Sequence, residues 1–294
     1  MAGADDNSMT TNAGATSDQV ASRGEPAVLY EPRNTGVAVV TFNRPDRMNA
    51  WGNPMSSEFY RCVDAAEADP GVRVIVITGK GRAFCAGGDM GGLQAISADT
   101  VGASGKTDFS TLVAERHPYF LTQLTKPVIA AINGSVAGMG LAQALTADIR
   151  FAAAGAKFTT SFARRGLVAE YGISWILPRL VGWNIAVELL LSGRTFLAEE
   201  AAQLGLITKV FPREELMDRV IAYAEDIARN CAPSSLAVMK RQLYADAGMS
   251  LVETSEKAEK LMHESMQRSE FIEGITAFFE KRPPNFPPLV AGGS

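Results

Sequence analysis

Short apolar runs alternate with amphipathic segments through the first two thirds of the chain. Runs rich in Val, Ile and Ala, each bounded by Gly, Pro or Asn, predict buried strands at residues 37–42, 72–78, 127–132 and 149–152. Residues 27–31 precede the first run across a short turn, and the two segments together predict a hairpin. Because strands and helices alternate in this way, the sequence predicts an α/β core.

Helical periodicity marks the segments between these strands and dominates after residue 183. The predicted helices cover residues 54–68, 109–124, 138–147, 185–191, 198–204, 214–230, 234–247, 251–267 and 270–280, with a short strand at 207–211. Ser269 is the predicted N-cap of the last helix, and Pro283 ends it. In that helix Phe271, Ile275 and Phe278 form an apolar stripe, which must pack on the core or on another subunit.

Composition divides the chain into three parts. Residues 1–25 are small, polar and acidic, without the basic start and apolar stretch of a signal peptide, and predict a disordered leader. Residues 26–212 hold the α/β core, and residues 213–294 form a helical region that we expect to mediate oligomerisation. Within the core, residues 91–106 contain few large apolar side chains and predict a mobile loop bordering a pocket.

Overall composition excludes several classes of function. The chain has 294 residues, of which 47% are hydrophobic and 20% charged, as in soluble globular proteins. A net charge of −4 without a basic cluster argues against nucleic-acid binding, and no apolar run is long enough to span a membrane. Cys62, Cys85 and Cys231 predict free thiols in a reducing cytoplasm. His117 and His263 lack metal-ligand spacing, so we expect no metal site.

Two glycine-rich turns carry the first candidate chemistry. Residues 83–89 follow the predicted strand 72–78, and residues 138–140 lead directly into a helix. A glycine turn that feeds a helix leaves backbone N–H groups unpaired at the positive end of the helix dipole. Either turn alone could simply pack a strand on a helix. Together, two such loops could direct one N–H each at a single carbonyl oxygen that becomes charged during a reaction.

Three linked motifs extend this observation. They are AFCAGGDM at residues 83–90, INGSVAGMGLAQALTADIRFAA at 132–153 and GLVAEYGISWILPRLVG at 166–182. In this order and spacing they resemble the crotonase (enoyl-CoA hydratase/isomerase) superfamily, and the similarity extends from about residue 28 to 286. The resemblance implies a ββα spiral core, a C-terminal helical trimerisation region and a homotrimer or homohexamer. It also implies an acyl-CoA thioester substrate, with no cofactor because coenzyme A enters as part of the substrate.

The same resemblance assigns roles to individual residues. The backbone N–H groups of Ala86 and Met139 would form the oxyanion hole. Further substrate-binding positions implied by the family are Arg47, Met48, Ala50, Gly87, Gly88, Asp89, Gly138, Phe162, Phe278 and Lys281. Of these, Asp89 can alternatively cap the helix that follows it.

Acidic residues distinguish the possible reactions. The two glutamates that position water in enoyl-CoA hydratases fall at Ala142 and Phe162, so both carboxylates are absent. Gln143 points about 100° away from the first position around the helix, and an amide cannot act as a base. Glu170 matches the single acid of some Δ3,Δ2-enoyl-CoA isomerases, and apolar neighbours such as Leu167 would raise its pKa.

The sequence therefore favours a double-bond isomerase of the kind found in fatty acid metabolism. It would pass through a thioester enolate, with Glu170 moving the proton from C2 to C4. Two alternatives remain open at this point. One is an enoyl-CoA hydratase, which is a lyase, and the other is a non-catalytic homologue that binds acyl-CoA.

Overall fold

A six-stranded sheet forms the centre of the molecule. The structure is a computed structural model, and it describes residues 25–89 and 116–289. In spatial order the strands are β1 (Val28–Pro32), β2 (Val37–Phe42), β3 (Val74–Gly79), β5 (Val128–Ile132), β7 (Ile149–Ala153) and β10 (Lys209–Phe211). β1 and β2 pair antiparallel, and all the other neighbours are parallel. The predicted hairpin and the four predicted buried strands are confirmed, although β3 begins two residues later than expected.

A second, smaller sheet explains how the chain coils. Its strands are β4 (Ala83–Cys85), β6 (Ser135–Ala137), β8 (Lys157–Thr159) and β9 (Phe196–Leu197). Each of β3, β5 and β7 in the large sheet is followed by a strand of the small sheet, and helical segments then lead back. This repeat confirms the predicted ββα spiral. The small-sheet strands have only two or three residues, which is too short for a periodic sequence signal.

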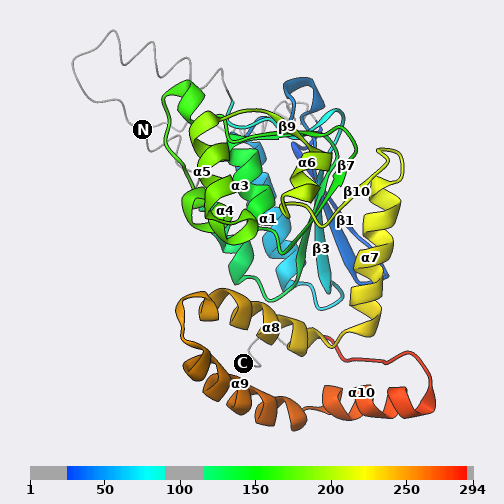
Figure 1. Ribbon diagram of the computed structural model, residues 1–294. Helices are drawn as coiled ribbons and strands as arrows, with labels where there is room; N and C mark the ends of the chain where they lie inside the picture. The colour runs from blue at the N-terminus through cyan, green and yellow to red at the C-terminus, as the bar shows by residue number, and fades with distance from the viewer. Residues whose placement is uncertain (1–24, 90–115, 290–294) are drawn as a thin grey trace, which may run out of the picture.

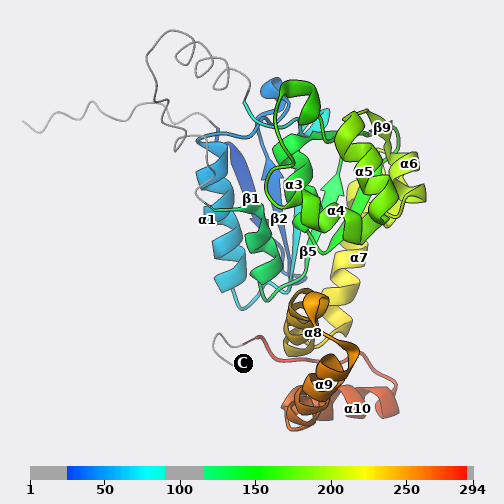
Figure 2. The same cartoon turned by 60° about the vertical axis from the view of Figure 1, so that its left-hand side comes forward.

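Helices cover both faces of the large sheet (Figures 1 and 2). They are α1 (Met55–Ala68), α3 (Gly138–Thr146), α4 (Ile173–Val181), α5 (Trp183–Ser192), α6 (Ala198–Gln203) and α7 (Leu216–Asn230). Alternate residues of β3 show the two-sided burial: Ile75 and Ile77 pack toward α1 and α3, whereas Val74 and Val76 pack toward α7. Burial on both faces accounts for the continuous apolar runs of these parallel strands.

Short 3-10 turns lie between several of these elements, and one of them replaces part of a predicted helix. They are η1 (Pro45–Arg47), η3 (Pro118–Gln123), η4 (Ala163–Arg165) and η5 (Asp246–Gly248). The predicted helix at 109–124 is described only from residue 116, and there the chain forms η3, which starts at a proline. Ser269 is the first residue of the last helix and not its N-cap, because Arg268 occupies that position. The predicted mobile loop at 91–106 and residues 1–24 of the predicted leader lie outside the described residues.

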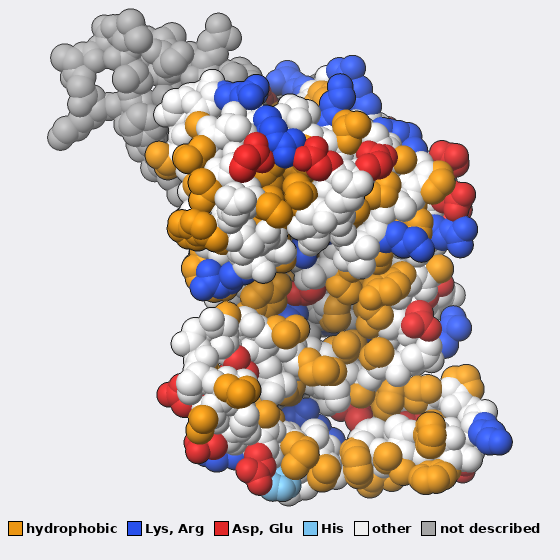
Figure 3. Space-filling view, viewed as in Figure 1, with side chains coloured by type: hydrophobic (Ala, Val, Ile, Leu, Met, Phe, Trp, Pro, Cys, Tyr) orange, Lys and Arg blue, Asp and Glu red, His pale blue; other side chains and the backbone are white. Residues whose placement is uncertain are grey.

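Three helices at the C-terminal end extend away from the two sheets (Figures 1 and 2). They are α8 (Pro233–Ala245), α9 (Leu251–Met266) and α10 (Ser269–Glu280). Large apolar side chains on α9 and α10 face outward, as the orange surface at the bottom of Figure 3 shows, and include Leu251, Val252, Phe271, Ile272, Phe278 and Phe279. α7, by contrast, belongs to the core, since Val220 and Ala224 are buried against the large sheet.

A buried ion pair fastens α8 to the core. The Lys240 side chain is only 5% exposed, and its Nζ lies 2.8 Å from Asp148 Oδ2. The same ammonium donates to the carbonyl oxygens of Leu121 and Lys126, at 2.8 and 3.0 Å. Tyr244 Oη donates to the other carboxylate oxygen of Asp148 at 2.9 Å. Burial lowers the pKa of Lys240, and the neighbouring Asp148 opposes that shift.

We expect Lys240→Met to lower the free energy of unfolding by about 3 kcal/mol, because it leaves a buried carboxylate without its counter-charge. Urea unfolding at one fixed protein concentration measures this change. The control is Arg219→Met, which removes an exposed pair with Glu215 and should cost less than about 1 kcal/mol. Equal effects of the two substitutions would contradict an anchoring role for Lys240.

Candidate active site

The two glycine-rich turns meet where the small sheet joins α3. β4 and β6 pair in parallel, so the loop after β4 and the start of α3 leave the sheet at the same edge. Gly87 has φ +104°, and a Cβ there would lie 3.3 Å from Ala137 O. A Cβ on Gly138, at φ +48°, would lie 3.8 Å from the Gly87 Cα. The turns are therefore in direct van der Waals contact, and both use backbone angles that favour glycine.

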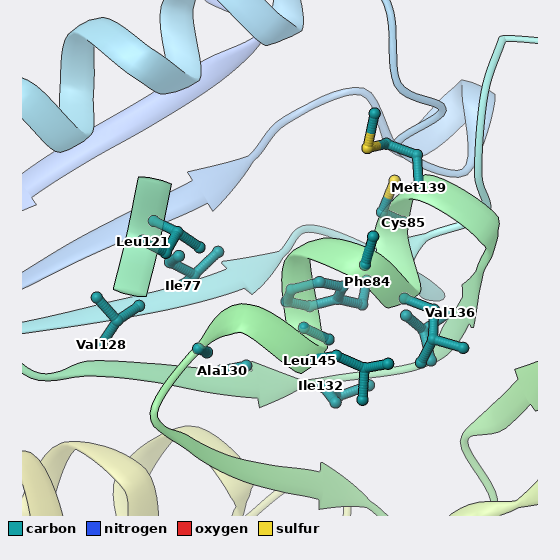
Figure 4. Packing of buried hydrophobic residues seen from close by; sticks show 14 of the residues in the cluster. Ile77, Phe84, Cys85, Leu121, Val128, Ala130, Ile132, Val136, Met139 and Leu145 are labelled. Atoms are coloured by element: carbon teal, nitrogen blue, oxygen red, sulfur yellow. The ribbon is translucent and has the colours of Figure 1, made fainter. Parts of the chain in front are cut away.

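The first turn of α3 also lies against the backbone of β4. A Cβ at Gly140 would stand 2.3 Å from Cys85 O, a separation that real side chains do not adopt. Figure 4 shows the side chains of Cys85 and Met139 next to each other at this junction. Burial raises the pKa of the Cys85 thiol to about 12. Cys85 is consequently a protonated packing residue and no nucleophile at neutral pH.

The hydrogen bonds of the first turn revise the predicted oxyanion donor. Ala86 N–H donates to Met48 O at 3.1 Å, so this amide already has a partner. Trp51 N–H donates to Gly87 O at 2.7 Å, and Asp89 N–H donates to Trp51 O at 2.9 Å. These bonds pair Trp51 with Gly88 as a parallel bridge, in which the N–H of Gly88 itself points away from Trp51. Within the described chain the amide of Gly88 has no hydrogen-bond acceptor, whereas that of Ala86 has one.

Met139 supplies the second candidate donor. It is the second residue of α3, and the first four N–H groups of a helix have no partner within it. Ala137 precedes the helix as N-cap and has no side-chain oxygen that could accept from these groups. The Met139 amide thus lies at the positive end of the α3 dipole, on the turn adjacent to the loop that carries Gly88.

A network around Asn49 holds the first turn in place, and the sequence analysis overlooked it. Asn49 is fully buried and donates to Ala83 O at 2.8 Å, while its Oδ1 accepts from Arg44 N–H at 2.8 Å. Arg44 also pairs with Asp89, with 3.3 Å between Nη2 and Oδ2, and Arg47 approaches the same oxygen at 3.5 Å. The sequence offered one signal, because Asn tolerates left-handed backbone angles better than most residues. In the structure Asn49 adopts such an angle, with φ +53°.

Asp89 therefore pairs with two arginines of the preceding loop in the structure. The helix that it was predicted to cap lies outside the described residues. Phe278 and Lys281, by contrast, belong to the C-terminal helices, which Figures 1 and 2 place at the opposite end of the molecule from these turns. Within one subunit the structure does not bring them to the other predicted site residues.

Apolar side chains occupy the two positions where hydratases carry glutamate. Ala142 is buried on α3, and the ring of Phe162 lies beside the second glycine turn, with Cε1 3.9 Å from a Cβ built on Gly138. Gln143 follows Ala142 and is also buried, and neither atom of its amide has a hydrogen-bond partner among the described residues. The structure gives no carboxylate at either of the two hydratase positions.

Glu170 stands in a tight turn that begins α4. Tyr171 and Gly172 both adopt positive φ, at +54° and +77°, and Ile173 N–H donates to Glu170 O at 3.1 Å. The Glu170 side chain is half-buried, and loss of hydration raises the pKa of its carboxyl group. Its carboxylate oxygens accept no hydrogen bond from any described residue. A partly desolvated, unpaired carboxylate is suited to accept a proton.

Glu170 lines a pocket of about 690 Å³. The other lining residues come from the segment around η3 (His117, Tyr119, Thr122), the end of α3 (Thr146), α4 and the turn before it (Tyr171, Gly172, Trp175, Ile176) and α8 (Tyr244). Thr146 is seven residues after Met139 on α3, which is two turns along the same face and about 10 Å along the axis. The pocket that Glu170 lines therefore extends alongside α3, the helix that also carries the Met139 amide.

In residues 25–89 and 116–289 no group of three or more His, Cys, Asp or Glu side chains is arranged to hold a metal ion. None of the helices in the same ranges is both long enough and apolar enough to cross a bilayer.

Comparison with known proteins adds the family context. A family model described as enoyl-CoA hydratase/isomerase matches residues 32–288. The 1,2-epoxyphenylacetyl-CoA isomerase of Escherichia coli is 35% identical over 257 residues, which cover 85% of this chain and 95% of that protein. The mitochondrial enoyl-CoA hydratase of Pongo abelii is 35% identical over 254 residues, which cover 86% of this chain and 84% of that protein.

Two solved structures show the same fold. An enoyl-CoA hydratase from Mycobacterium marinum is 59% identical, with a TM-score of 0.64 over 75% of this chain and 98% of that one. An enoyl-CoA hydratase from Bacillus anthracis is 26% identical, with a TM-score of 0.80 over 89% of this chain and 99% of that one. The similarity therefore covers both the spiral core and most of the C-terminal helices.

We expect Gly140→Ala to destabilise the protein by at least about 2 kcal/mol, because the added methyl group overlaps Cys85 O. Thermal unfolding followed by circular dichroism measures the effect. Gly248→Ala is the matched control, since its Cβ would meet no atom within 4 Å and its φ is not positive. If both variants melt at the same temperature as the parent protein, the close contact between α3 and β4 is not required.

Proposed function

The chain belongs to the enoyl-CoA hydratase/isomerase family, and within this family we propose that it isomerises the double bond of an enoyl-CoA through a thioester enolate. Proteins of the family process acyl-CoA thioesters. The observation that carries the proposal is Glu170, the only acidic residue lining the described pocket, with a pKa raised by burial. The absence of carboxylates at Ala142 and Phe162 supports isomerisation over hydration.

In the proposed reaction, the thioester carbonyl oxygen of a 3-enoyl-CoA accepts hydrogen bonds from the amides of Gly88 and Met139. The Glu170 carboxylate removes a proton from C2, and the electron pair moves into the thioester to give a dienolate. The same side chain, now a carboxylic acid, returns the proton at C4, so the double bond moves to C2–C3. Atoms and electrons balance without a cofactor, since coenzyme A is part of the substrate.

Electrostatics favour backbone amides as the groups that stabilise the thioester carbonyl oxygen. Negative charge develops on the carbonyl oxygen, and backbone amides at the start of α3 are fixed in place before the reaction, so they need no reorganisation. Removing one preorganised donor of this type typically costs about 3 kcal/mol of transition-state stabilisation. We assign the first donor to Gly88 because the amide of Ala86 is engaged with Met48 O.

Hydration is the second candidate, because several relatives are named as enoyl-CoA hydratases. It requires groups that hold and deprotonate a water molecule, which Glu170 would have to provide alone. A non-catalytic acyl-CoA-binding role is the remaining alternative. Product analysis in labelled water distinguishes all three, because hydration alone introduces oxygen from water into a 3-hydroxyacyl product.

The exposed apolar surface of the C-terminal helices supports a second proposal, that the protein assembles as a trimer or a dimer of trimers. Phe278 and Phe279 on α10 are each more than three-quarters exposed. Large apolar patches on a monomer are unfavourable in water and commonly mark an interface. Phe278 and Lys281, which do not reach the glycine turns within one subunit, could approach the site of a neighbouring subunit in such an assembly.

We expect Glu170→Gln to lower kcat on a 3-enoyl-CoA by about 10²–10⁴-fold, because the amide cannot accept the proton. The affinity for the substrate should change little.

In the parent enzyme kcat should fall as the pH drops through the raised pKa of Glu170, because only the ionised carboxylate is a base. Because burial raises this pKa, the acidic limb should lie at a higher pH than for an exposed glutamate.

Formation of the conjugated thioester, followed by ultraviolet absorbance, measures both effects. Glu214→Gln is the matched control because Glu214 is exposed and lies outside the pocket. Unaltered turnover by Glu170→Gln would falsify the proposed role. A labelled 3-hydroxyacyl product from crotonyl-CoA in labelled water would favour hydration, and tight binding without turnover on any acyl-CoA would favour a binding protein.

For assembly, we expect light scattering after gel filtration to give three or six times the 31.3 kDa of one chain. The double variant Phe278→Asp, Phe279→Asp introduces charge into the exposed stripe and should shift the protein to smaller species. Tyr223→Asp on α7 is the control for an exposed aromatic side chain outside the C-terminal helices. A monomeric parent protein would refute self-association.

A further inference from the structure

Rings line the pocket that contains Glu170. Five of its ten lining residues carry a ring, namely His117, Tyr119, Tyr171, Trp175 and Tyr244, and the only aliphatic one is Ile176. The rings come from three separate segments of the chain, at η3, at α4 with the turn before it, and on α8. Flat side chains therefore converge on one cavity from several sides, as they would around a flat ligand.

Four of these rings make further contacts that hold them in place. Tyr244 donates its hydroxyl hydrogen to Asp148, which the buried Lys240 fixes in turn. The rings of His117 and Tyr119 stack, with centroids 5.5 Å apart and planes 16° from parallel. Arg179 lies 3.8 Å from the centroid of Trp175 and covers one face of the indole. The aromatic surfaces are thus preorganised.

Tyr171 reaches the pocket at the expense of backbone strain. Its φ of +54° is unusual for a bulky residue, and the turn that imposes this angle also presents Glu170 to the same cavity. A residue with less steric conflict, such as glycine or asparagine, would satisfy the turn equally well. The phenol ring is therefore held next to the proposed base by a conformation that the turn alone does not require.

Two of the rings remain substantially exposed. Tyr119 is 52% and Trp175 is 46% exposed, although both border a cavity. Aromatic side chains pair best with another ring, in offset or edge-to-face arrangements with centroids about 4.5–7 Å apart. An unbranched acyl chain cannot make such contacts, and it loses more rotational freedom than a rigid ring on binding.

We propose that the acyl group of the substrate is cyclic, with an aromatic or cyclohexenyl ring bound between Tyr119, Tyr171 and Trp175. This substrate class rests on the proposed function for its chemical step, because Glu170 is the base beside the ring. The thioester would be held at the start of α3, at Met139, and the ring would point along α3 toward Thr146 of the pocket.

Binding of two unreactive thioesters tests the substrate class without relying on turnover. Phenylacetyl-CoA and octanoyl-CoA have acyl groups with the same number of carbon atoms, and neither contains the double bond that the reaction needs. Isothermal titration calorimetry on the full-length protein should give a Kd for phenylacetyl-CoA at least about 10-fold lower than that for octanoyl-CoA. Free coenzyme A, titrated in parallel, shows how much of the affinity comes from the coenzyme A moiety that both thioesters share.

Substitutions of pocket rings test whether the preference for phenylacetyl-CoA arises in this pocket. Trp175→Leu and Tyr119→Leu should each reduce the 10-fold preference to less than about 3-fold, while the Kd of free coenzyme A stays the same. Trp183→Leu is the matched control, because Trp183 is 75% exposed on the next helix and does not line the pocket. Circular dichroism confirms that each variant is folded, and the two variants in separate elements guard against a local folding defect.

Equal affinities for the two thioesters, tighter binding of octanoyl-CoA, or a preference that survives both leucine substitutions would overturn the proposal. Failure to bind either thioester would overturn it as well. Because no chemical step occurs in these titrations, the result is separate from the fate of the isomerase assignment. Full turnover by Glu170→Gln together with a preserved ring preference would refute only the proposed reaction. Loss of turnover in Glu170→Gln together with equal affinities for the two thioesters would refute only the substrate class.

Discussion

Direct contact between two backbone segments is the constraint on which the proposed site depends. The start of α3 lies against the carbonyl of Cys85, with no room for a side chain at Gly140, and Gly87 lies close to the carbonyl of Ala137 with a positive φ. Parallel pairing of β4 with β6 produces this contact, because it brings two loops out at the same edge of the small sheet. The ββα spiral, with its repeated passage between two sheets, is what places β4 and β6 side by side. Fold and proposed chemistry are thus connected through a few backbone atoms.

The sequence predicted the fold well where the physical signal is long. Apolar runs such as residues 127–132 predicted strands that are buried on both faces, and the C-terminal helices were found within a few residues. It failed where the outcome depends on non-local contacts. The small-sheet strands are too short to show a period, and η3 replaces the described part of a predicted helix. Ala86 was assigned as a donor, but its amide is taken by Met48 O, a bond that no local pattern reveals.

The same distinction applies to the candidate site. Glu170 stood out in the sequence because a lone acid among apolar residues is chemically conspicuous, and its half-buried position with a raised pKa agrees with that reasoning. The aromatic lining did not stand out, since His117, Tyr171 and Tyr244 are far apart in the chain and none belongs to a motif that specifies a ring pocket. Asp148 and Lys240 were equally hidden, because the sequence does not show that a lysine on α8 reaches the edge of β7.

One feature of the pocket connects substrate choice to architecture. Tyr244 belongs to α8, so a wall of the cavity comes from the C-terminal helical region and not from the spiral core. The ammonium of Lys240, one turn earlier, fixes how that wall is oriented. Exchanging the tail of this protein for that of a relative would therefore replace part of the acyl-binding surface as well. During divergence, mutations that remodel the tail and mutations that alter ligand preference would not be independent of one another.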